Sequence, residues 1–152
     1  MRAPAIVPVW SVPSVEIIIA AATALVLGTI GSLIAGSVTP EGYLETSTEE
    51  IARVAEVPLA QVEKTLAVMQ TFDPVGVCAR TLSECLLIQA RHLNLNNPLV
   101  TAIIAHHIHH LENRNYKAIC RELKVGLEAV LAAVGLIRKL DPKPGREFND
   151  EE

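Results

Sequence analysis

Aromatic residues are scarce in this 152-residue sequence, at 3% of the chain, although half of its residues are hydrophobic. The core must therefore be built from Leu, Ile, Val and Ala, and this mixture, with few alternating β-branched runs, favours helices. We expect an all-α fold, a bundle of short helices. Cysteines are also few: Cys78, Cys85 and Cys120 form no CxxC pair and give an odd count. Buried thiols in a reduced, cytoplasmic protein account for them.

Signatures of catalysis and of metal binding are missing as well. The sequence has no glycine-rich phosphate loop, and its Cys and Ser residues are not grouped with His and a carboxylate. Four histidines lie between positions 106 and 110, and His106 with His110 has the i, i+4 spacing of a chelating pair. No cysteine or carboxylate cluster is placed to complete a site, so we expect His107 in the core and the others in solvent. The sequence predicts no enzyme, no metal site, no cofactor and no small-molecule substrate.

Charge is absent from Ile17 to Pro40, a stretch long enough to span a bilayer. No Lys or Arg cluster flanks it, and three glycines weaken it as a membrane span. A signal peptide fits poorly, because residues 1–15 hold one arginine and three prolines. Three interpretations stay open: a buried or partner-covered helix, a membrane span, or a poorly ordered N-terminus.

Repetition is the strongest positive feature of the sequence. The segment from Ile51 to Pro74 recurs from Ile119 to Pro142, with each equivalent residue 68 positions later and no insertion. Each copy predicts a helix, a tight turn, a second helix and a stop at an Asp-Pro pair. This is the shape of a helix-turn-helix, so we expect two helix-turn-helix-like repeat units.

Capping residues mark several helix starts between and before these stops. Ser47 has capping-box spacing to Glu50, Thr81 to Glu84, and Asn97 precedes Pro98. Residues 99–111 carry an apolar stripe that predicts a continuous helix. The predicted organisation is an apolar segment, irregular and then helical, a first helix-turn-helix-like unit, a helical pair with the second unit, and an acidic tail: residues 1–38, 39–80, 81–146 and 147–152.

The two copies differ in charge. Residues 49–76 hold five acids and two bases, whereas residues 117–144 hold three acids and six bases. Different partners would explain this contrast, and so would drift of solvated helix faces. Base readout requires Arg, Lys, Asn or Gln along the recognition helix, but the helix from Leu127 has no base before Arg138. Protein docking is therefore favoured over direct DNA reading.

Three ordered motifs resemble one known family. They are Phe72-Asp73-Pro74-Val75-Gly76-Val77-Cys78-Ala79-Arg80, then Asn113-Arg114-Asn115-Tyr116-Lys117, then Leu140-Asp141-Pro142-Lys143-Pro144-Gly145. Together with Glu41-Gly42-Tyr43-Leu44, which is similar to an Asp-Gly-Tyr-Leu turn, residues 36–146 resemble the core-binding region of the sigma-54 class of bacterial transcription initiation factors. The resemblance implies a factor that binds core RNA polymerase and directs it to promoters, in a closed complex opened by an ATP-driven activator.

Two parts of the family pattern are not found. Residues 1–35 are unrelated to the family's activator-contacting region, and its C-terminal DNA-binding signature is absent before Glu152. We therefore expect a fragment that binds polymerase but does not recognise a promoter alone. Promoter DNA would be met only through the missing region, or weakly through the basic second unit.

The resemblance also suggests where partners bind. Candidate polymerase contacts are Phe72, Asp73, Pro74, Gly76, Val77, Arg80, Asp141, Pro142, Lys143, Pro144 and Gly145, and candidate residues near nucleic acid are Arg121, Lys124, Arg138 and Lys139. Helix termination and packing would equally explain both Asp-Pro motifs, and Gly76 is expected to supply a positive φ. The alternative function is a small helical regulator, DNA-binding through its second unit or membrane-tethered.

Overall fold

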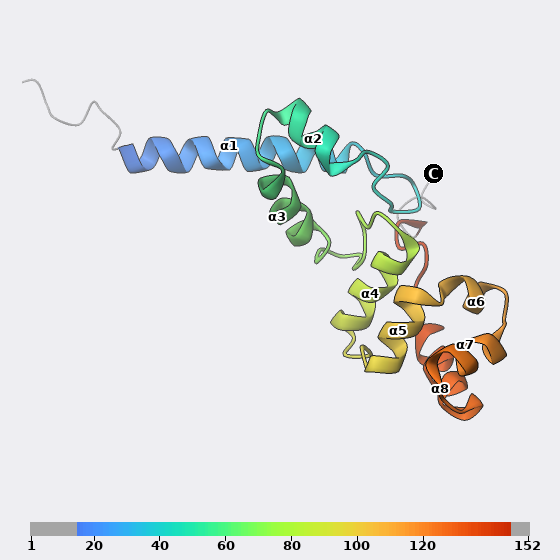
Figure 1. The fold of residues 1–152 in the computed structure, drawn as a ribbon. Coiled ribbons are helices and arrows are strands. Elements are labelled where there is room, and N and C mark those ends of the chain that lie inside the picture. Colours follow the sequence, from blue (N-terminus) through green and yellow to red (C-terminus); the bar gives the residue numbers. More distant parts are fainter. Residues whose placement is uncertain (1–14, 147–152) are drawn as a thin grey trace, which may run out of the picture.

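The computed structural model describes residues 15–146, and the first residues and the predicted acidic tail lie outside this range (Figure 1). The described part is all α, as predicted, with isolated bridges but no strands. Its helices are α1 (Val15–Ala35), α2 (Thr48–Ala55), α3 (Leu59–Met69), α4 (Leu82–His92), α5 (Pro98–His106), α6 (Ile108–Glu112), α7 (Tyr116–Leu123) and α8 (Leu127–Ile137).

The sequence repeat is also a structural repeat with the same 68-residue spacing. Helices α2 and α3 begin and end 68 positions before α7 and α8, respectively. The residue after the first helix of each pair, Glu56 or Lys124, takes a left-handed conformation, with φ of 55° and 54°. The expected pair of helix-turn-helix-like units is therefore confirmed.

The first unit shares its core with the C-terminal half of α1. Ile30 and Ile34 of α1 are fully buried, and they pack with a cluster from the loop after α1, from α2 and α3, and from the segment before α4: Leu44, Ile51, Ala52, Val62, Leu66 and Cys78. The N-terminal half of α1 extends beyond α2 and α3 (Figure 1). In the portion of the chain that the structure describes, no helix is long and apolar enough to cross a membrane.

The second unit packs on the helical pair α4 and α5. Its core is entirely aliphatic, in agreement with the low aromatic content, and comprises Leu86, Ala90, Val100, Ile103, Ile104, Ile119, Val130, Ala133, Val134, Ile137 and Leu140. Full burial of each large side chain contributes about 1.5–3 kcal/mol. The two units therefore have separate cores, joined by the segments around the two Asp-Pro stops.

The predicted helix caps are present. The Oγ of Ser47 accepts a hydrogen bond from the N–H of Glu50 at 3.2 Å, and Thr81 does the same for Glu84 at 3.1 Å. The Oδ1 of Asn97 accepts from the N–H of Val100 at 2.9 Å. Each cap satisfies a backbone donor that the first helical turn leaves without a partner.

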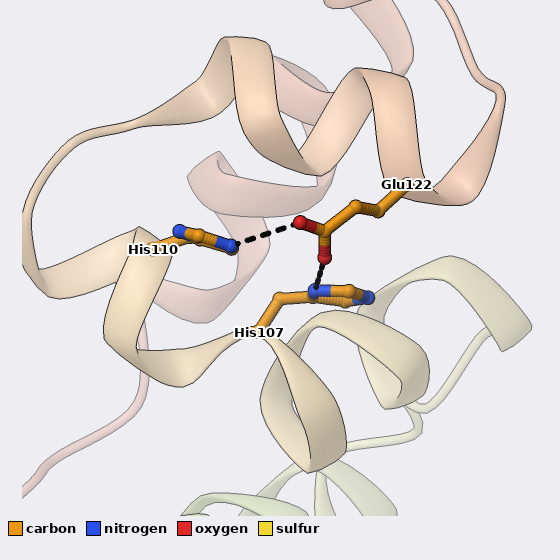
Figure 2. Close-up of side chains that lie close together, drawn as sticks. All are labelled: His107, His110 and Glu122. Carbon is orange, nitrogen blue, oxygen red and sulfur yellow. Dashed lines mark hydrogen bonds and ion pairs between the residues drawn. The ribbon is translucent and has the colours of Figure 1, made fainter.

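The continuous helix predicted over residues 99–111 was wrong. The chain breaks between α5 and α6 at His107, whose φ and ψ are −124° and 20°. Histidine is a weak helix former, and four of them in five positions give little local preference for an unbroken helix. His107 is buried as expected, but His110 is half-buried and faces α7 (Figure 2).

Candidate functional site at the junction of the two units

The two Asp-Pro stops, 68 residues apart in sequence, meet at one place in the structure. A cavity of about 270 Å³ is lined by Asp73 and Pro74 from the first stop and by Asp141 and Pro144 from the second. Gln89 of α4 lines the same cavity. The structure therefore brings the two predicted contact segments together around α4, and we call this region the junction.

A buried glutamine holds the second stop against α4. The side chain of Gln89 donates from Nε2 to the carbonyl oxygen of Asp141 at 2.7 Å, and its Oε1 accepts the N–H of Asp141 at 2.8 Å. The carboxylate of Asp141 accepts the N–H of Lys143 at 2.8 Å, which tightens the turn that follows. Both backbone groups of Asp141 are thus satisfied by one side chain.

The end of the second stop packs on the turn that precedes the first unit. The hydroxyl of Tyr43 donates to the carbonyl oxygen of Pro142 at 2.6 Å, and the N–H of Gly145 donates to Glu41 at 3.1 Å. A Cβ on Gly145 would lie 2.6 Å from the backbone nitrogen of Gly42, so only glycine fits. Burial, followed by the nearby Cys85, raises the pKa of Tyr43 to about 12, which keeps the phenol protonated as a donor.

Gly76 lies between the first stop and α4. Its φ is +92°, as expected, and a Cβ there would meet Cys85 Sγ and Gln89 Nε2 at 3.0 Å each. Val77 packs against the first core. These residues serve close packing at the junction.

Arg80 takes part in an ion-pair network between α3 and α4. Its guanidinium lies 2.7 Å from Glu84 and 3.0 Å from Glu63, and its backbone N–H also donates to Glu84. Burial alone would raise the pKa of Glu84, but hydrogen bonds from Arg80 and Gln70 outweigh it and hold that pKa below its usual value. Arg80 therefore has internal partners in this structure.

Phe72 differs from the other candidates because it is a large hydrophobic side chain that is exposed. It is 54% exposed and lines an apolar groove of about 760 Å³ between α1 and α3, together with Leu27, Val68 and Met69. Lys64 lies at the same groove. Phe72 and this groove give the first unit an apolar surface without a partner among the described residues.

The four basic candidates do not form one patch. All are exposed, but Arg121 lies in the last turn of α7 and Lys124 directly after that helix, whereas Arg138 and Lys139 follow the far end of α8. Helix α8 has 11 residues, so its ends are about 16 Å apart at 1.5 Å per residue. The structure separates these residues into two pairs.

Two residues of the junction were missing from the sequence-based set. Gln89 could have been noticed, because it follows the apolar Cys85 by four residues on the buried face of α4. Tyr43 carried no such signal beyond its place in the turn motif. The contacts of both reach residues more than 50 positions away.

Comparison with known proteins agrees with this architecture. A family model described as sigma-54 factor, core binding domain, matches residues 24–152. The chain is 39% identical to RNA polymerase sigma-54 factor 2 of Bradyrhizobium diazoefficiens over 78% of its length and 22% of that protein. It is 36% identical to the RNA polymerase sigma-54 factor of Salmonella typhimurium over 81% of its length and 27% of that protein.

A third relative, the RNA polymerase sigma-54 factor of Rhizobium etli, is 41% identical over 70% of the chain and 20% of that protein. The chain thus spans about a quarter of the length of these relatives or less. Because the family match covers most of the chain, the chain belongs to the sigma-54 factor core-binding-domain family.

Proposed function

We propose that this chain binds core RNA polymerase and acts in transcription initiation without chemistry of its own, beside polymerase in the cytoplasm. The match of residues 24–152 to a core-binding domain is the observation that carries this proposal. Promoter recognition and response to an ATP-driven activator would belong to a whole factor, of which the chain spans a minor part.

The junction supports this role by fixing the two units relative to each other. The Gln89 clamp and the Tyr43 hydrogen bond tie the second stop both to α4 and to the turn before α2. A binding protein with a fixed frame loses less conformational entropy when it docks on a large partner. In this proposal most residues of the two Asp-Pro stops hold the two units in place and do not themselves contact polymerase.

Phe72 is the polymerase contact that the geometry favours most among the predicted residues. Aromatic side chains, Phe included, are enriched in protein interfaces, and hot spots lie where such side chains are buried on binding. The neighbours of Phe72 in the groove, Leu27 and Val68, are also exposed. We place the centre of the docking surface here, with Lys64 at its polar margin.

The test compares Phe72→Ala with Leu131→Ala, an exposed apolar residue of the second unit with 45% exposure. We expect Phe72→Ala to weaken the affinity of the full chain for core RNA polymerase about tenfold or more, measured by titration, because loss of a hot spot costs over about 1 kcal/mol. Leu131→Ala should stay within about twofold. Equal effects would contradict the docking surface.

Failure of the unmodified chain to bind polymerase at all would overturn the proposed function itself.

The exposed bases of the second unit support a second role, weak contact with DNA phosphate. Binding of duplex DNA in place of polymerase, with an affinity that falls steeply as salt rises, would favour that role.

A further inference from the structure

Two histidines and a glutamate meet away from the junction, between α6 and α7. His110 Nε2 lies 3.2 Å from Glu122 Oε1, and His107 Nδ1 lies 3.0 Å from the other oxygen of the same carboxylate, Oε2 (Figure 2). The two histidines come from the break between α5 and α6 and from α6, and the carboxylate reaches down from α7 (Figure 2).

His107 carries an unsatisfied polar atom at the centre of this group. The residue is 9% exposed, and its Nδ1 is buried and makes no hydrogen bond, although a Glu122 oxygen lies 3.0 Å away. A buried polar atom that makes no hydrogen bond costs about 1–3 kcal/mol. Such an atom, aimed at a carboxylate and a second imidazole, points to a ligand between them.

The donor set matches one class of ligand. One nitrogen from each histidine and one oxygen of Glu122 all lie within 4.8 Å of one another. Bonds of about 2.0–2.2 Å in a tetrahedral zinc site place neighbouring ligand atoms about 3.3 Å apart, close to the distance from each histidine nitrogen to the nearer of the two Glu122 oxygens. Two imidazoles and one carboxylate suit zinc better than calcium or magnesium, which prefer all-oxygen sites.

We propose that His107, His110 and Glu122 form a Zn²⁺-binding site that ties α6 to α7. Zinc would bind the three side chains and leave a fourth position for water. The ion would replace the contact between His107 and Glu122 and fix the first helix of the second unit against the α5–α6 break. The first unit has no counterpart, because Val54 occupies the position equivalent to Glu122.

The test titrates the full, tag-free chain with Zn²⁺ alone by calorimetry. We expect one ion per chain, and at least about tenfold weaker binding in His110→Ala and in Glu122→Gln, since loss even of a residue that only supports a ligand costs 10–100-fold. His109→Ala and His106→Ala are the controls, because both side chains are exposed neighbours outside the group. They should change affinity less than about twofold. His107 itself is left intact because it is buried.

A second readout separates this site from the thiols. Co²⁺ bound by these side chains should show its d–d absorption without a thiolate charge-transfer band, and Cys120→Ser should not alter the spectrum. Zn²⁺ should raise the unfolding temperature of the unmodified chain more than that of Glu122→Gln, because binding to the native state stabilises it. Absence of binding, a thiolate band, or loss of binding only in the two control variants would overturn the proposal.

Discussion

Phe72 in the first helix-turn-helix unit is 54% exposed, whereas its equivalent in the second, Leu140, is 6% exposed and belongs to the core. Other equivalent positions are buried in both units. Ile51 and Ile119 are both buried, and so are Val62 and Val130. The two copies thus share these buried positions, but at the stop only the first copy exposes a large hydrophobic side chain, Phe72.

The outer surfaces diverge in chemistry. The first unit is acidic and carries exposed Val54 at a position where the second has Glu122. The second unit is basic and presents Lys124 and Arg138 to solvent. Burial constrains the frame because a core is close-packed, whereas exposed positions are free to suit different neighbours. The comparison indicates that the two copies share a backbone arrangement and differ in the surfaces that they offer to other molecules.

The largest expected effect tests whether matched buried positions contribute equally to the stability of the two units. Ile51→Ala and Ile119→Ala each remove a buried side chain at matched positions, so each should lower the free energy of unfolding by about 2–5 kcal/mol in urea denaturation. Val54→Ala, at an exposed position, should change it by less than about 0.5 kcal/mol. A loss below about 1 kcal/mol in only one copy would break the equivalence.

The next largest loss of stability is expected at Gly76, just after the first Asp-Pro stop. Gly76→Ala combines a φ of +92° with a Cβ 3.0 Å from Cys85 Sγ, and we expect a loss of about 2–4 kcal/mol in the free energy of unfolding. The second copy has Pro144 at the equivalent position, so it does not use a positive φ there.

Gly126→Ala is the control for this strain, because that glycine has a φ of −69° and the Cβ that alanine would add meets no atom within 4 Å beyond its chain neighbours. Gly126→Ala should lower the free energy of unfolding by no more than about 1 kcal/mol, the scale of a changed N-cap. Similar losses in both variants, measured by urea denaturation, would show that the packing around Gly76 is not the cause.

The sequence predicted the local elements well because their signals are local. The 68-residue offset and the caps at Ser47, Thr81 and Asn97 set where helices begin, and short-range hydrogen bonds confirm them. The break at His107 was missed because an apolar stripe outweighed the weak helix preference of the surrounding histidines.

The junction and the histidine group could not be predicted in the same way. Gln89 binds Asp141 across 52 positions, and Tyr43 binds Pro142 across 99. His110 meets Glu122 only because the chain turns between α6 and α7. Side chains paired by folding over such distances leave no periodic signal, so hydrophobic spacing and capping motifs carry no information about them.

The smallest expected effect comes from a substitution that gives the second copy the residue found in the first. Gly135 lies inside α8 at the position equivalent to Ala67 of α3 and is exposed, and an added Cβ would meet no atom within 4 Å beyond its chain neighbours and the backbone of its own helix. Gly135→Ala should raise the free energy of unfolding by about 0.5–1 kcal/mol, measured by urea denaturation, because alanine loses less backbone freedom in a helix. Ala67→Gly should lower it by a similar amount. If Gly135→Ala stabilised the chain but weakened its binding to core polymerase, a partner would approach α8 closely at that glycine, and docking would not be confined to the first unit.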